Sequence, residues 1–157
     1  MRQLVFITIL SGLWIASLAQ TEKPELRKAA FNLNNKQVAL SGYDPVSYFT
    51  ASKPILGKAN FATAYAGVTY YFSSAENKEL FKKNPAQYEP QYGGWCAYAM
   101  GIDGSKVEVD PETFKIVNGK LCLFYNKFFT NTLKSWNKDE TRLHKNADAN
   151  WAKTFKN

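Results

Sequence analysis

The chain has 157 residues, a length typical of one domain. Its hydrophobic fraction of 45% is ordinary for a globular protein, and its aromatic fraction of 15% predicts a core built largely from rings. The formal net charge is +7, and lysine supplies almost all of the positive charge. Arg27 and Arg142 are the only arginines after the first twenty residues. Because nucleic-acid recognition favours guanidinium groups, this composition argues against a nucleic-acid binder and indicates a solvated lysine surface.

The first 19 residues have the pattern of a signal peptide. Arg2 precedes an uncharged stretch from Leu4 to Leu18, and Ser17 and Ala19 are small residues at the positions that signal peptidase requires. The uncharged stretch is shorter than the roughly 20 residues of a membrane-spanning helix. We therefore expect cleavage after Ala19, export to the periplasm or the extracellular space, and no stable membrane insertion of the mature chain.

A polar lead-in over residues 20–36 precedes the predicted domain, which covers residues 37–126. Strand-forming residues flank Ala66–Gly67 and Asn118–Gly119, and both dipeptides suit the tight turn of a hairpin. The predicted fold class is therefore α+β, with a small antiparallel sheet of hairpins and short helices.

Helices are predicted after the first hairpin and at the end of the chain. Ser73 and Glu76 have the spacing of a capping box, and Pro85 predicts that the helix they begin ends before it. From Lys127 onwards the apolar residues recur at spacings of about four, which is typical of helices. Residues 127–157 are thus predicted to form a C-terminal helical extension that packs on the domain.

Several segments of the chain resemble the YHS domain family, in its exported bacterial branch. The resemblance covers roughly Ala39 to Tyr125, and the combined order and spacing of its segments is specific, whereas any one of them alone is weak. These segments are Tyr43–Phe49, Tyr70–Ser74, Phe81 with Asn84–Pro85 and Tyr88, Gly93–Ala97, and Gly119–Leu121. The resemblance implies a small α+β fold of hairpins and short helices.

The resemblance also implies a link to heavy-metal handling, and here the chain departs from the family pattern. Metal-associated members carry cysteines just after Asp-Pro-Val and at the strand-to-helix junction. This chain has Ser47 and Ser73 at those positions, and Asn77 near a third. Because hydroxyl and amide groups are poor ligands for soft metals, we do not expect the thiolate site of the family in this chain.

Cys96 is the residue at which we predict a binding site. It follows two glycines and lies among aromatic residues, so Tyr92, Trp95 and Cys96 are the candidate ligand-binding residues. Met100 lies four residues further along a predicted helix, and a thiolate with a thioether is a partial Cu(I) site, which His144 could complete. Copper or another soft metal ion is the candidate cofactor. The competing interpretation is that Cys96 and Met100 are core packing.

Two other hypotheses concern the same cysteine. In an exported protein, Cys96 and Cys122 favour one disulfide, which would make the chain a metal-free structural or interaction domain. Catalytic motifs are scarce, because a single histidine excludes a paired-histidine zinc motif and the cysteines do not form Cys-x-x-Cys. We therefore predict a non-enzymatic domain that binds a small molecule or a metal ion, with a thiol-dependent activity as the third hypothesis.

Overall fold

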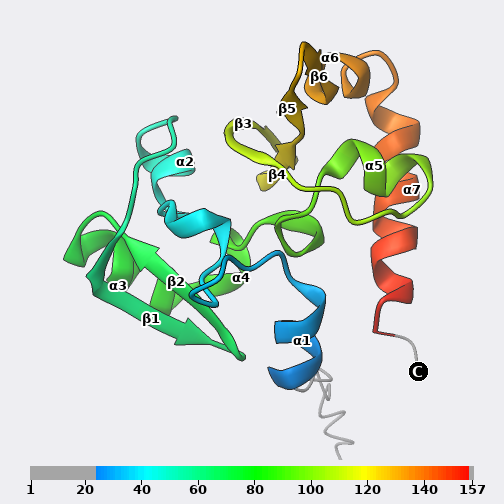
Figure 1. The fold of residues 1–157 in the computed structure, drawn as a ribbon. Coiled ribbons are helices and arrows are strands. Elements are labelled where there is room, and N and C mark those ends of the chain that lie inside the picture. The colour runs from blue at the N-terminus through cyan, green and yellow to red at the C-terminus, as the bar shows by residue number, and fades with distance from the viewer. Residues whose placement is uncertain (1–23, 156–157) are drawn as a thin grey trace, which may run out of the picture.

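The computed structural model describes residues 24–155, so the predicted signal peptide lies outside the described residues. The architecture is α+β, as the sequence predicts (Figure 1). Within the described range, no helix is long and apolar enough to cross a bilayer. In chain order the elements are α1 (Pro24–Ala30), the 3-10 turn η1 (Leu40–Gly42), α2 (Ser47–Thr50), β1 (Lys58–Tyr65), β2 (Val68–Phe72), α3 (Ala75–Lys83), α4 (Pro85–Tyr88), the 3-10 turn η2 (Gln91–Gly94), α5 (Ala97–Ile102), β3 (Asp110–Val117), β4 (Lys120–Phe124), β5 (Asn126–Lys127), β6 (Thr130–Asn131), α6 (Thr132–Trp136) and α7 (Glu140–Lys153).

Antiparallel hairpins form the sheets of this structure, and two of them confirm the predictions. β1 pairs with β2, β3 pairs with β4, and each pair is joined by a two-residue turn, Ala66–Gly67 and Asn118–Gly119 respectively. All four turn residues have positive φ, as a type I′ turn requires. Glycine and asparagine adopt this backbone region more easily than other residues, which explains why these turns are readable from the sequence.

A third hairpin, β5–β6, occupies residues that the sequence pattern assigns to a helix. Its two-residue turn is Phe128–Phe129, with φ of 51° and 64°. Asn131 then caps α6 by accepting a hydrogen bond from the Leu133 backbone amide at 3.0 Å. The prediction that helical structure begins at Lys127 is therefore wrong by five residues. The turn is also strained, since a non-glycine residue in the left-handed region costs of order 1–3 kcal/mol.

The start of α3 differs from the predicted capping box by one residue. Ser74, not Ser73, is the N-cap, and its hydroxyl accepts a hydrogen bond from the Asn77 backbone amide at 3.2 Å. The Ser73 side chain is instead directed to Asp44, as described below. The helix ends at Lys83, immediately before Asn84 and Pro85, as predicted.

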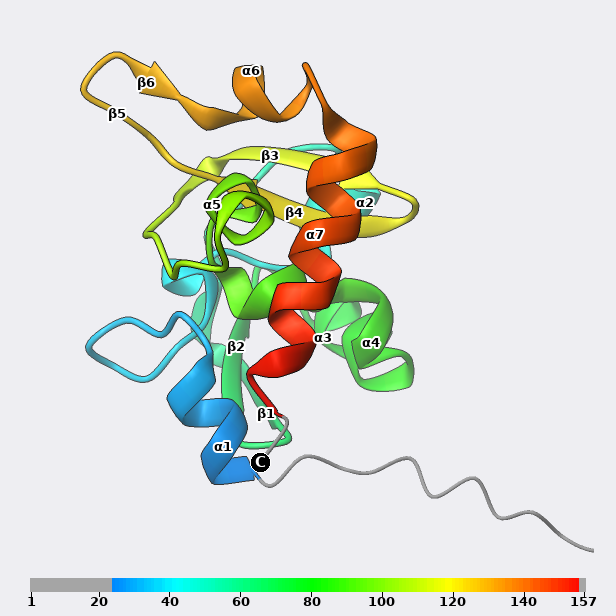
Figure 2. The ribbon, with the colours of Figure 1, turned by 90° about the vertical axis from the view of Figure 1, so that its right-hand side faces the viewer.

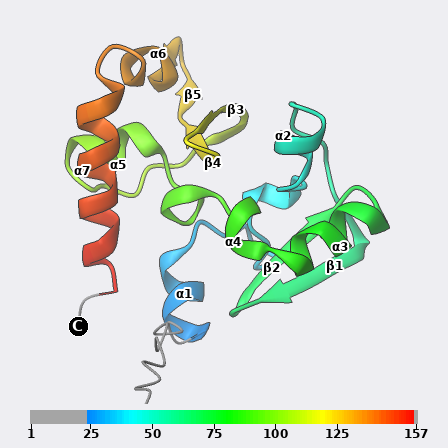
Figure 3. The ribbon, with the colours of Figure 1, turned by 180° about the vertical axis from the view of Figure 1, so that it is seen from behind.

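Two hydrophobic clusters fill the molecule, and β4 separates them. Leu121 and Leu123 belong to the cluster formed with α1, α2, β2 and α3, whereas Cys122 and Phe124 belong to the cluster formed with α5, α6 and α7. Successive strand residues point to opposite faces, so one buried strand supplies both clusters. The view from behind shows the two groups of elements on either side of β3–β4 (Figure 3).

Helix α7 packs closely against α5 and holds it in place (Figure 2). A Cβ atom at Gly101 would lie 2.5 Å from the Leu143 carbonyl oxygen, so glycine permits this approach. Asn150 on α7 donates to the Met100 carbonyl oxygen at 2.9 Å and thereby satisfies one of the open carbonyl groups at the end of α5. Gly93 is also required by packing, because a Cβ there would lie 2.7 Å from the Trp151 ring.

Candidate functional site

The three positions at which the family resemblance places metal-binding cysteines meet around one buried carboxylate. Asp44 is 0% exposed, and its Oδ2 atom accepts hydrogen bonds from the Ser73 amide at 2.9 Å, the Ser73 hydroxyl at 2.6 Å and the Asn77 side-chain amide at 2.7 Å. Its Oδ1 atom accepts from the Val46 amide at 2.8 Å. The Ser47 hydroxyl donates to the Asp44 backbone carbonyl at 2.8 Å. We call these residues, Asp44, Ser47, Ser73 and Asn77, the Asp44 cluster.

The Asp44 cluster does not fit a soft metal ion. Its groups are oxygen and amide donors, which soft metals bind poorly. Between residues 24 and 155, no buried side-chain nitrogen or oxygen lacks a hydrogen-bond partner, so the cluster has no unused atom directed at a ligand. Its bonds instead tie the loop before α2 to the junction between β2 and α3. The cluster is therefore a structural crosslink.

Cys96 lies at the start of α5, where its sulfur contacts polar groups of the β5–β6 hairpin. The sulfur accepts a hydrogen bond from the Tyr125 backbone amide at 3.4 Å and lies 3.4 Å from the Thr132 hydroxyl. Because that hydroxyl donates its single proton to the Tyr125 carbonyl at 3.0 Å, the Cys96 thiol is the donor to Thr132. Both partners could also donate to a thiolate, provided that Thr132 turns its proton towards the sulfur.

A largely apolar cavity of about 260 Å³ opens beside α5 and has Cys96 in its wall. We call it the α5 cavity. Cys96 lines this cavity, although its exposed fraction is 0%. The cavity is bounded by α5, by the loop that follows it and by the base of the β5–β6 hairpin, all of which lie on one side of the molecule in Figure 2. The other lining residues are Tyr98, Ala99, Ile102, Asp103, Ser105, Val107, Tyr125 and Thr132.

One edge of the α5 cavity carries a negative charge. Ser105, through its side chain and its backbone amide, holds the pKa of the Asp103 carboxyl below its ordinary value. The Ser105 amide donates to Asp103 Oδ1 at 2.9 Å. The carboxylate is therefore ionised at neutral pH and favours a ligand that presents a polar or cationic group at this edge.

Of the three predicted ligand-binding residues, only Cys96 lines the α5 cavity. Tyr92 lies in the second hydrophobic cluster, where its hydroxyl donates to Asp148 at 2.9 Å and burial raises its pKa well above the ordinary value. The Trp95 indole nitrogen donates to the Ala30 carbonyl oxygen at 2.7 Å, which anchors α1. Sequence reasoning missed Tyr98 and Ile102, whose spacing of four on one helical face is the signal that could have identified them.

The structure distributes the three predicted metal ligands over different surroundings. Met100 is 1% exposed and packs in the second hydrophobic cluster, away from the lining of the α5 cavity. His144 lines a separate cavity on α7, with its Nε2 atom 3.8 Å from Asp148 and its ring 6.0 Å from that of Trp136. In residues 24–155, no group of three or more His, Cys, Asp or Glu residues is placed to hold a metal ion. A Cu(I) site on Cys96, Met100 and His144 stays a prediction.

The predicted disulfide between Cys96 and Cys122 is wrong, because both thiols are free and buried. Cys96 forms a parallel bridge with Leu123, whose side chain points to the opposite face of β4 from that of Cys122. The two sulfurs are therefore separated by the strand. Burial raises the pKa of the Cys122 thiol to about 12, which leaves it unreactive at neutral pH.

Comparison with known proteins bears on part of this chain. Residues 46–92 match the family model described as the YHS domain. This stretch includes Ser47, Ser73 and Asn77 but ends before Cys96, so the α5 cavity is formed by residues beyond the match. No curated protein and no solved structure gave a significant match.

Proposed function

We propose that this chain, a member of the YHS domain family by its match over residues 46–92, is a non-enzymatic binding domain for a small, largely apolar molecule. The observation that carries the proposal is the α5 cavity, about 260 Å³ in volume, with Cys96 among its lining residues. Apolar cavities of about 150 Å³ already bind benzene, so this one has room for a two-ring molecule such as indole. A polarisable sulfur and the aromatic rings of Tyr98 and Tyr125 suit a flat aromatic ligand.

The surroundings of Cys96 support binding over catalysis. A nucleophilic cysteine needs a base within hydrogen-bond reach, and the partners of this sulfur are a backbone amide and the Thr132 hydroxyl. His144, the only histidine in the sequence, lines a different cavity. The ligand is therefore held by packing and by the edge charge of Asp103, with no covalent step.

Indole binding to the full chain tests the proposal. We expect saturable binding by isothermal titration calorimetry, and we expect Ala99→Leu to abolish it, because the added side chain fills the cavity. Ala64→Leu is the matched control, since Ala64 is an exposed residue of β1 remote from the cavity lining. Absence of indole binding to the parent chain, or equal binding by the Ala99→Leu variant, would refute the proposal.

A second probe examines the charged edge of the cavity. Tryptamine is indole with an added ammonium group, which we expect the Asp103 carboxylate to favour over the uncharged ring. The affinity ratio of tryptamine to indole should approach unity in Asp103→Asn, while indole affinity itself is retained. A ratio that the substitution leaves unchanged would remove Asp103 from the site.

The soft-metal hypothesis makes a different prediction for the same chain. If Cu(I) bound at Cys96, a titration would saturate near one equivalent, Cys96→Ser would abolish it, and Met100→Leu would weaken it. Cys122→Ser is the control, because the Cys122 sulfur lies on the far side of β4. We expect no binding that depends on Met100, since that side chain is enclosed in the core.

Export remains part of the proposed function. It is supported by the signal-peptide pattern of residues 1–19. Expression of the full chain in a bacterial host, followed by mass measurement of the product, should give a chain that begins at Gln20. A product that retains Met1 to Ala19 would contradict export by this route.

A further inference from the structure

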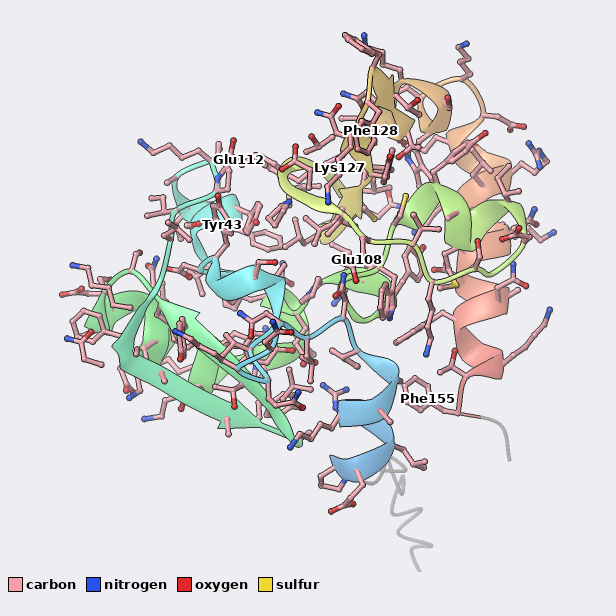
Figure 4. All side chains as sticks on the ribbon, viewed as in Figure 1. Tyr43, Glu108, Glu112, Lys127, Phe128 and Phe155 are labelled. Atoms are coloured by element: carbon pink, nitrogen blue, oxygen red, sulfur yellow. The ribbon has the colours of Figure 1, made fainter. Side chains whose placement is uncertain are left out.

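The tip of the β5–β6 hairpin carries two exposed phenylalanines in a strained turn. Phe128 is 85% exposed and Phe129 is fully exposed. The hairpin projects beyond the rest of the fold, at the upper left of Figure 2, and Figure 4 labels Phe128 and Lys127 next to each other on it. The rings are therefore presented to the solvent, away from both hydrophobic clusters.

Folding does not require phenylalanine at this turn. The same two-residue turn with positive φ occurs at Ala66–Gly67 and at Asn118–Gly119, where small or flexible residues adopt it. At Phe128–Phe129 the chain instead has two bulky residues with φ of 51° and 64° and neither ring buried. Strain and exposure at one site, without a gain in packing, indicate that the rings act on something outside the chain.

The charged residues without an ion-pair partner on the hairpin and α6 are lysines, and the nearest acidic contact is at the hairpin base, where Asn126 donates to Asp110 at 3.5 Å. Among the charged residues between 126 and 142, Asp139 pairs with Arg142 and Glu140 pairs with Lys115. Lys127, Lys134 and Lys138 are exposed, and none of the three has an ion-pair partner in the part of the chain that the structure describes. The end of the molecule formed by this hairpin and α6, located in Figure 1, thus combines exposed rings with lysines that have no ion-pair partner among the described residues.

The geometry points to the surface of an anionic lipid bilayer as the occupant of this tip. We infer that Phe128 and Phe129 enter the headgroup region while Lys127 and Lys134 attract anionic lipids. Two phenylalanine side chains offer roughly 300–500 Å², well below the roughly 800 Å² that a stable protein interface buries on each partner. A narrow convex tip can, however, enter a bilayer surface without a complementary partner. This is peripheral docking and needs no membrane-spanning segment.

Tryptophan fluorescence locates the tip on the membrane in the full chain. Phe129→Trp places a reporter in the turn, and Leu56→Trp is the matched control, because Leu56 is 60% exposed on another part of the molecule. With vesicles of phosphatidylcholine and phosphatidylglycerol that contain brominated acyl chains, we expect added quenching for Phe129→Trp and none for Leu56→Trp. Any tethering by residues 1–23 is common to both variants. Equal quenching of the two would overturn the inference.

A turn replacement tests whether the rings supply the binding. Phe128→Asn with Phe129→Gly copies the turn of β3–β4, so the fold should be at least as stable by thermal unfolding. The comparison is made in the chain that begins at Gln20, which keeps both hydrophobic clusters. There, the partition coefficient of the doubly substituted chain onto anionic vesicles should be roughly tenfold or more below that of the parent. Lys127→Gln with Lys134→Gln should weaken binding to anionic vesicles and leave the weak binding to pure phosphatidylcholine unchanged.

Two results would contradict membrane docking. In one, the turn replacement binds anionic vesicles as well as the parent chain. In the other, the parent chain fails to bind vesicles but forms dimers by analytical ultracentrifugation that the turn replacement abolishes, which would assign the tip to a second copy of the chain. The turn residues do not line the α5 cavity, so we expect the turn replacement to leave indole binding unchanged. This inference and the proposed function can therefore fail separately.

Discussion

The Asp44 cluster is polar and the α5 cavity is largely apolar, and the two also differ in whether their polar groups are fully hydrogen-bonded. In the cluster, the Asp44 carboxylate accepts four hydrogen bonds and is 0% exposed. At the cavity, the Cys96 sulfur has two weak partners, and Cys96 is among the residues that line the open volume. A saturated polar group holds a fold together, whereas a partly satisfied one beside a cavity can respond to a ligand.

This difference bears on the positions at which the family resemblance implies cysteines. The residues at those positions, Ser47, Ser73 and Asn77, each donate a hydrogen bond to Asp44. The remaining candidate for ligand binding lies on α5 and the hairpin base, outside the matched residues 46–92. The Asp44 cluster and the candidate binding cavity thus lie in different segments of the chain.

Removal of the central carboxylate should have the largest effect on stability. In Asp44→Ala, four donors lose their acceptor in a buried or half-buried setting, so we expect the free energy of unfolding to fall by about 3 kcal/mol or more. Urea unfolding followed by circular dichroism measures this change. Asp103→Ala is the matched control, because it removes an exposed carboxylate at the cavity edge and should leave stability nearly unchanged. An equal loss of unfolding free energy in the two variants would contradict the structural role assigned to the Asp44 cluster.

The buried Cys122 thiol should make stability depend on alkaline pH. Its pKa is raised from 9.0 to about 12 in the folded chain, so the unfolded chain loses this proton first as the pH rises. The stabilisation is fully present below pH 9 and is lost between about pH 9 and 12, at a rate of up to about 1.4 kcal/mol per pH unit. Between pH 9 and 10, the unfolding free energy of Cys122→Ala should therefore fall less steeply with pH than that of the parent chain. An unchanged slope would show that Cys122 titrates normally in the folded chain.

Removal of the Thr132 hydroxyl should change the reactivity of Cys96 and lower the stability of the fold only slightly. Thr132→Val removes the oxygen that lies 3.4 Å from the Cys96 sulfur and that could donate to its thiolate. We expect the reaction of Cys96 with methyl methanethiosulfonate to slow several-fold, while stability falls by about 1 kcal/mol. Thr130→Val, at an exposed position of the same hairpin, should change neither quantity. A slower reaction in both variants would indicate a general effect on the hairpin.

Much of the fold follows from local signals in the sequence. The turns at Ala66–Gly67 and Asn118–Gly119 could be predicted because each contains a glycine between two strand-forming segments, and the end of α3 because Asn84–Pro85 stops a helix. The third hairpin could not be predicted, since its turn uses Phe128–Phe129, which have no local preference for that backbone. Its pairing is closed by contacts such as the Thr132 amide to the Tyr125 carbonyl at 3.0 Å.

The candidate site was predictable only at its centre. Cys96 stands out by residue type, but Tyr92 and Trp95 were chosen for their proximity in sequence and bond to Asp148 and to Ala30 instead. The true lining comes from three separate segments that only the tertiary structure brings together. The prediction of a disulfide was wrong for a similar reason. The face of β4 on which the Cys122 side chain lies is set by the pairing of β4 with β3, and the number of cysteines does not reveal it.

The reactivity of the two thiols in the native, non-reduced full chain tests the central claim most directly. We predict that methyl methanethiosulfonate modifies Cys96 at a measurable rate, that bound indole slows this reaction in proportion to occupancy, and that Cys122 reacts only when the chain unfolds. Peptide mass mapping assigns the modified thiol. If Cys96 reacts no faster than Cys122, or if saturating indole leaves its rate unchanged, the α5 cavity is not the binding site.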